Sequence, residues 1–102
     1  MITLEFVFNK EKMDADGVDM DILLAPMREY ATKWDIEEPK KGFFQKEGEN
    51  ALCDLCMFVA KYPRKDLKFV TYLDKWILDS GDEIDDCIAE TYEMYKREGI
   101  MV

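Results

Sequence analysis

Apolar residues recur along most of the chain at the spacing of a helix, whereas the first residues alternate between apolar and polar positions as a strand does. In residues 2–9 the apolar side chains stand at every second position: Ile2, Leu4, Phe6 and Phe8. This segment is predicted to be a strand, which needs a partner in residues 42–45, in the tail 100–102 or in another copy of the chain. Without one of these partners, an irregular arm or a first helical turn is expected.

The first helical pattern begins at Asp19 or Asp21, since both are good N-caps, and extends to Trp34. Pro26 lies inside this pattern and lacks a backbone N–H, so a kink or a break into two pieces is expected there. The second pattern covers residues 49–62 and is apolar almost all round, which is typical of a helix at the centre of a domain. Pro63 is expected to end it, because the residue before a proline is pushed out of helical space.

The third pattern covers residues 64–79, where Leu67, Val70, Leu73, Trp76 and Ile77 form a helical stripe. Residues 67–73 alone also fit a strand, but the length of the pattern favours a helix.

The fourth pattern starts at Ser80, which forms a capping box with Glu83, and stops at Gly99. Its inward side is expected to consist of Ile84, Cys87, Ile88, Thr91, Tyr92 and Tyr95.

These patterns predict one mainly α domain over residues 1–102, a small bundle of about four helices with a short extended segment at the N-terminus. An α+β arrangement is the alternative. Residues 35–48 form a long polar connection that contains Phe43 and Phe44. Adjacent residues of an extended chain point in opposite directions, so one ring is expected to pin the connection to the core and the other to serve as an exposed anchor.

The charge of the chain excludes some ligands and favours others. With 23 acidic and 14 basic residues the net charge is −9, which argues against direct binding to nucleic acid or to anionic lipid. The charge is also segregated, since residues 79–93 contain no lysine or arginine among their acidic residues: Asp79, Asp82, Glu83, Asp85, Asp86, Glu90 and Glu93. Any charged partner is therefore expected to be basic.

The groupings that conventional enzymes use are missing from the sequence. The chain has no histidine and a single serine, Ser80, which excludes Ser–His and Cys–His nucleophile pairs, and its isolated glycines form no nucleotide-binding motif. Cys53 and Cys56 form a C-x-x-C pair, but they lie in an apolar helical pattern with Cys87 as the only further thiol. Buried, reduced thiols that resist reagents in the native protein are therefore expected.

We therefore expect a non-enzymatic interaction or regulatory module without a cofactor, which presents an acidic surface to a basic protein. The alternative is a metal- or thiol-dependent protein that uses Cys53, Cys56 and Cys87. The small size also leaves room for a homodimer. A cytoplasmic protein without a membrane segment is expected from the reduced thiols and the lack of long apolar runs. The candidate partner-binding residues are Asp82, Asp86, Glu90, Phe43 and Phe44.

Overall fold

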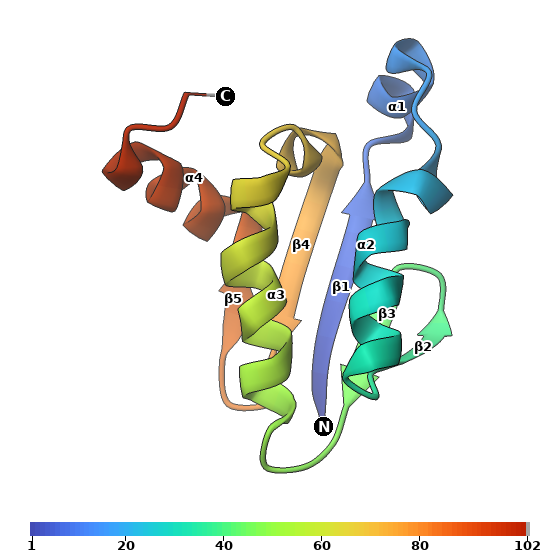
Figure 1. Cartoon of the computed structure of the whole chain (residues 1–102), viewed down its shortest axis with the longest axis vertical. Coiled ribbons are helices and arrows are strands. Elements are labelled where there is room, and N and C mark those ends of the chain that lie inside the picture. The colour runs from blue at the N-terminus through green and yellow to red at the C-terminus, as the bar shows by residue number, and fades with distance from the viewer. Residues whose placement is uncertain (102) are drawn as a thin grey trace.

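The alternating segment at the N-terminus forms the central strand of a five-stranded antiparallel sheet with the order β2-β3-β1-β4-β5 (Figure 1). The protein is seen in a computed structural model that describes residues 1–101. Its elements are β1 (Ile2–Phe8), α1 (Lys10–Asp16), α2 (Met20–Lys33), β2 (Glu37–Lys40), β3 (Phe43–Lys46), α3 (Ala51–Lys65), the 3-10 helix η1 (Phe69–Tyr72), β4 (Leu73–Asp79), β5 (Ile84–Asp86) and α4 (Cys87–Glu98). The prediction of a mainly α bundle is wrong, and the α+β alternative is correct.

The predicted strand at the N-terminus is confirmed, together with one of its proposed partners. Leu4 faces Phe44 of β3 on one side and Leu78 of β4 on the other, so β1 has no free edge along its centre. The connection predicted for residues 35–48 contains β2 and β3, which pair as a short hairpin. Val102, part of the candidate partner at residues 100–102, lies outside the described residues.

The third predicted helix, over residues 64–79, is wrong. Residues 73–79 form β4, and the helical residues of this range are 64–65, which end α3, and 69–72, which form the 3-10 helix η1. The register explains the error. Val7 pairs with Lys75 whereas Phe8 pairs with Leu73, so Asp74 is an extra residue in β4. Such a bulge places the inward side chains of Leu73 and Trp76 three residues apart, which imitates the period of a helix.

The start of the last helix was also predicted too early. Ser80 and Glu83 do bond each other, the Glu83 N–H donating to the Ser80 hydroxyl oxygen over 3.2 Å, but they close the turn between β4 and β5. Asp86 is the N-cap, since its carboxylate accepts from the N–H groups of Ile88 and Ala89, both over 3.1 Å. Gly99 ends the helix in the left-handed conformation, as predicted.

Three side chains predicted to face inward from the last helix, Cys87, Thr91 and Tyr95, are buried. Two others are not. Ile84 lies on β5 with 71% of its surface exposed, and Tyr92 is 43% exposed. Ile84 was wrongly predicted to face inward because the helix was predicted to start too early, so that a residue of β5 was placed on a helical face.

The two prolines interrupt the helices less than their chemistry suggests. At Pro26 a kink or a break was expected, and there is no break, because α2 is one continuous helix. The helix α3 extends through Pro63 to Lys65, so it ends nearly one turn later than predicted. Contacts with α4 hold these last residues: the Tyr95 hydroxyl donates to the Pro63 carbonyl over 2.6 Å, and Arg64 pairs with Glu98.

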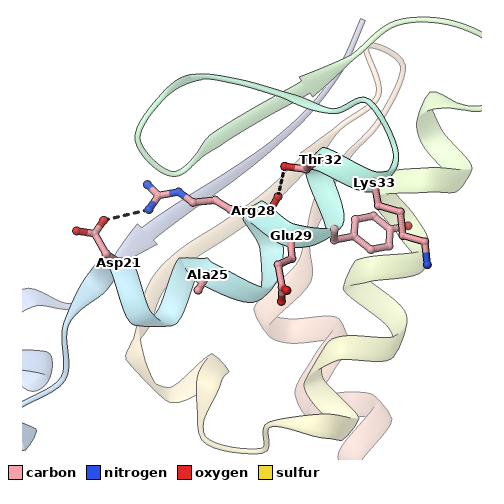
Figure 2. Close-up of a pocket in the computed structure, with 7 residues that line it drawn as sticks. Asp21, Ala25, Arg28, Glu29, Thr32 and Lys33 are labelled. Carbon is pink, nitrogen blue, oxygen red and sulfur yellow. Dashed lines mark hydrogen bonds and ion pairs between the residues drawn. The ribbon is translucent and has the colours of Figure 1, made fainter.

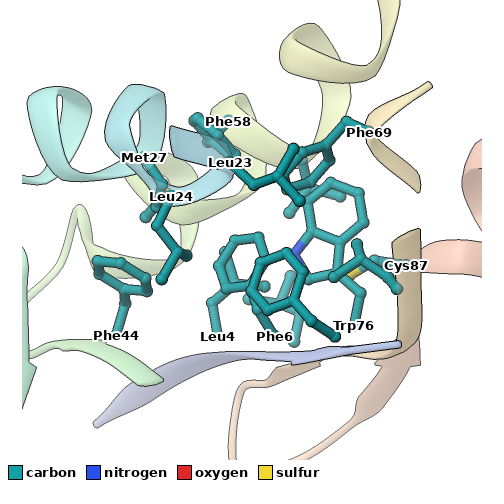
Figure 3. Packing of buried hydrophobic residues seen from close by; sticks show 14 of the residues in the cluster. Leu4, Phe6, Leu23, Leu24, Met27, Phe44, Phe58, Phe69, Trp76 and Cys87 are labelled. Carbon is teal, nitrogen blue, oxygen red and sulfur yellow. The ribbon is translucent and has the colours of Figure 1, made fainter. Parts of the chain in front are cut away.

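The core lies between one face of the sheet and the helices α2 and α3, which Figure 1 shows on the same side of it. Figure 3 shows Leu4, Phe6 and Trp76 from the sheet beneath Leu24 and Phe58 from these helices. A helix that packs on a sheet buries one face only, and the opposite side of α3 is therefore open: Leu52 is 42% exposed and Cys53 is exposed. The prediction of a helix packed on every side is wrong. No helix within residues 1–101 is long and apolar enough to cross a membrane.

Candidate interaction surfaces

The structure separates the two adjacent phenylalanines in the way their alternation predicts. Phe44 is fully buried on the inner face of the sheet, opposite Leu4, and belongs to the core. Phe43 lies on the outer face, partly exposed, with the Lys40 ammonium group 5.2 Å from the centre of its ring. Only Phe43 of the two can therefore contact a partner.

The three acidic candidates lie at the other edge of the sheet. Asp82 is exposed in the turn between β4 and β5, Asp86 caps α4, and Glu90 stands in the first turn of that helix. Two strands, β1 and β4, separate them from the strand that carries Phe43. The structure thus places Asp86 close to Glu90, puts Asp82 at the opposite end of β5 from Asp86, and leaves Phe43 apart from all three.

We call the acidic side chains around this edge the acidic surface: Asp79, Asp82, Glu83, Asp85, Asp86, Glu90 and Glu93. The ion pairs found within residues 1–101 use other carboxylates, those of Asp21, Glu38, Asp54 and Glu98. Burial, followed by the neighbouring charges of Asp85, Asp86 and Glu93, raises the pKa of Glu90. The exposed apolar side chains of Ile84 and Tyr92 belong to the same stretch of chain. The carboxylates of this stretch thus form no ion pair within residues 1–101, although Arg64 and Arg97 line the same cleft as Asp85 and Glu90, and two exposed apolar side chains stand among them in the chain.

The three thiols differ in exposure, contrary to the prediction that all are buried. Cys87 is fully buried, Cys56 is partly buried in a cleft of about 380 Å³ between α3 and α4, and Cys53 is exposed. Burial raises the pKa of Cys56 and raises that of Cys87 to about 12, so both stay protonated at neutral pH. Within residues 1–101 no group of three cysteine or carboxylate side chains is placed to hold a metal ion.

We expect this difference in exposure to set the order of thiol labelling. In the native protein a maleimide should modify Cys53 first and Cys87 last, and all three thiols should react after unfolding. Mass spectrometry of partially labelled, digested protein gives the order. Replacing Cys53 with serine should remove the fastest phase, and labelling of Cys87 as fast as that of Cys53 would contradict the assignment of Cys87 to the core.

An open hollow of about 700 Å³ lies on the outer side of α2, and two of the charged residues that line it, Asp21 and Arg28, pair with each other. Figure 2 shows Arg28 reaching Asp21 along the helix. The same guanidinium group binds both carboxylate oxygens of Glu38 over 2.9 and 3.2 Å, and Lys41 pairs with Asp21 over 3.0 Å. Hydrogen bonds from Lys41 and Arg28 lower the pKa of Asp21. This network ties α2 to the β2–β3 hairpin, which is a structural role.

A groove of about 510 Å³ between α2 and α3 was not predicted from the sequence. Aromatic rings from both helices line it, with lysines along its sides. The local signal was present, because Tyr30 and Trp34, and likewise Phe58 and Tyr62, are spaced by four residues and share a helix face. The sequence could not show that the two faces meet.

The comparisons assign no relatives to this arrangement: no family model matches the chain, and no curated protein and no solved structure matches it either.

Proposed function

We propose that the protein is a non-enzymatic interaction module that presents the acidic surface to a basic partner protein. The observation that carries this proposal is the set of carboxylates between Asp79 and Glu93, none of which forms an ion pair within residues 1–101. Asp86 stabilises α4 as its N-cap and Asp79 accepts from the Gly81 N–H, but like charges held close together oppose folding, so the other carboxylates of this stretch have no such structural role. A positively charged surface would turn the same field into attraction, and would steer the encounter as well.

Two exposed apolar side chains refine the chemistry of this partner. Ile84 and Tyr92 stand within the acidic stretch, 71% and 43% exposed. Interfaces commonly combine an apolar centre with a charged rim, because buried apolar contacts give affinity and charges give orientation. The partner should therefore carry lysines or arginines around an apolar patch.

A charge reversal that preserves folding tests this proposal. Asp82→Lys with Glu93→Lys changes two exposed carboxylates and leaves the Asp86 cap intact. We expect the variant to capture basic partners from native cell extract roughly tenfold less well than the parent, and with a weaker dependence on salt. Quantitative mass spectrometry of the captured proteins at two salt concentrations measures both effects.

A matched control is available at the other end of the molecule. Glu11 and Asp14 are exposed on α1, and Glu11→Lys with Asp14→Lys makes the same change in net charge far from the acidic surface (Figure 1). This control should capture the same partners as the parent. If both double variants lose the partners equally, or if neither does, the acidic surface is ordinary solvated surface and the proposal is wrong.

A further inference from the structure

The groove between α2 and α3 has a continuous aromatic wall. The ring centres of Tyr30 and Trp34 are 6.1 Å apart, those of Tyr30 and Phe58 are 5.4 Å apart, and Phe58 stacks on Tyr62 at 5.0 Å. Phe58 is buried beneath the others, whereas Trp34 is 39% exposed and Tyr30 and Tyr62 are partly exposed. Aromatic side chains that remain partly exposed in a concave site are strong contact points for a ligand, because their apolar area is large and stiff.

Hydrogen bonds hold the two tyrosine rings and the backbone at Trp34 in place. The Tyr30 hydroxyl donates to the backbone carbonyl of Asp54 on α3, which fixes the two helices against each other at the floor of the groove. The Tyr62 hydroxyl donates to the Asp66 carboxylate over 3.3 Å, and the Trp34 carbonyl accepts from the Lys46 ammonium group. The groove is therefore formed before any ligand arrives, so binding does not require the rings to be ordered.

Positive charge surrounds the aromatic wall. Lys33 lies in the last turn of α2. Lys61 and Lys65 are four residues apart and lie on the same side of α3. All three ammonium groups are exposed and without an ion pair within residues 1–101, and Glu29 is the one carboxylate among the lining residues. Lys33 and Lys65 lie in the last turns of their helices, where positive charge is favourable, but Lys61 and Lys65 repel each other at a spacing of four residues, so folding does not explain Lys61. In a chain with net charge −9 this excess is local to the groove.

We propose that the groove binds an acidic peptide segment of a partner protein that carries an aromatic residue. The aromatic side chain would lie against Trp34 and Tyr62, and the flanking carboxylates would pair with Lys33, Lys61 and Lys65. A short peptide fits this chemistry better than a nucleic acid does, because three lysines match a few carboxylates, whereas a phosphate backbone requires a larger basic surface. The site is distinct from the acidic surface, so the two proposals can fail separately.

Trp34 makes the groove directly observable. The chain has two tryptophans, and the other, Trp76, is fully buried in the core. A ligand in the groove should therefore shift the emission of Trp34 alone. We choose as a probe an oligoglutamate peptide with one central phenylalanine, and as its control the same peptide with alanine in that place. We expect saturable binding of the phenylalanine peptide and at least about tenfold weaker binding of the control, since stacking on the wall would be lost.

Variants of the lysines test the charge contribution. The double variant Lys61→Glu with Lys65→Glu should bind the phenylalanine peptide at least about tenfold more weakly than the parent. The control, Lys75→Glu with Lys96→Glu, makes an equal charge change on exposed lysines outside the groove and should weaken binding much less. If the glutamate variant does not fold, Lys61→Gln with Lys65→Gln replaces it. The acidic-surface variant Asp82→Lys with Glu93→Lys should still bind the peptide.

Three results would overturn the proposal. The first is equal binding of the two peptides, which would show that the aromatic wall takes no part. The second is equal binding by the parent and the folded Lys61 and Lys65 variant. The third is a shift of Trp34 emission by a single-stranded oligonucleotide at a lower concentration than the phenylalanine peptide needs. That result would assign the groove to nucleic acid.

Discussion

Replacing Phe6 with alanine is expected to lower the free energy of unfolding by about 3–5 kcal/mol. Phe6 is 5% exposed on the central strand, and the rings of Phe8, Phe44, Phe58, Phe69 and Trp76 all have centres within 6.4 Å of its own. Its removal would leave a cavity between sheet and helices that rigid aromatic neighbours cannot fill by small movements. Since a domain of this size is stable by roughly 5–15 kcal/mol, this loss is a large fraction of the total and should lower Tm clearly.

The next residue on the same strand provides the control. Val7 points to the outer face and is 37% exposed, so its replacement by alanine should have an effect below about 1 kcal/mol. Urea unfolding followed by the emission of the buried Trp76 measures both variants. If the two substitutions had equal effects, the register of β1 would be wrong, because a shift by one residue exchanges the two faces of a strand.

The sequence predicted those elements whose apolar pattern has a single period. This group includes the strand at the N-terminus, α2 with its cap at Asp19, most of α3, and the end of α4 at Gly99. β4 was not predictable in this way, because the bulge at Asp74 changes its period from two to three at the start of the strand. Residues 42–45 were proposed as a strand partner, but the hairpin of β2 and β3 was not predicted, since its strands have four residues each, too few to show a period.

The candidate surfaces differ in the same respect. The acidic surface could be found from the sequence because most of its charge lies in one stretch, which a hairpin and a helix start keep together in space. The groove could not, since Trp34 and Tyr62 come from helices separated in the chain by the β2–β3 hairpin. The alternation of a strand predicts that one of Phe43 and Phe44 is buried and the other exposed, but the structure was needed to show that Phe44 is the buried one. Long-range pairing is thus the information that local patterns lack.

A partly buried ion pair that joins three elements is expected to give the second large effect on stability. The Lys46 ammonium group at the end of β3 lies 2.7 Å from the Asp54 carboxylate in the first turn of α3, with side chains 19% and 11% exposed. It also donates to the Trp34 carbonyl at the end of α2. We expect Lys46→Met to lower the free energy of unfolding by roughly 2–3 kcal/mol, because a shielded carboxylate and a carbonyl both lose their donor.

Asp54→Ala should lower the free energy of unfolding less, by roughly 1–2 kcal/mol. The Lys46 ammonium group would still donate to the Trp34 carbonyl, and its flexible side chain can reach water. The double variant should then be more stable than the sum of the two losses predicts, by roughly 1 kcal/mol. Urea unfolding of the four proteins gives this coupling directly.

The exposed pair Arg64–Glu98, with side chains 45% and 40% exposed, serves as the comparison. Water and salt screen such a pair, so its coupling should be smaller and should fade at high ionic strength, whereas that of Lys46 with Asp54 should largely persist. Equal coupling and equal salt dependence of the two pairs would show that the Lys46–Asp54 contact is as solvated as the surface pair. In that case Lys46 would not fasten the end of α2 to the sheet, and the fixed position of Trp34 would need another cause.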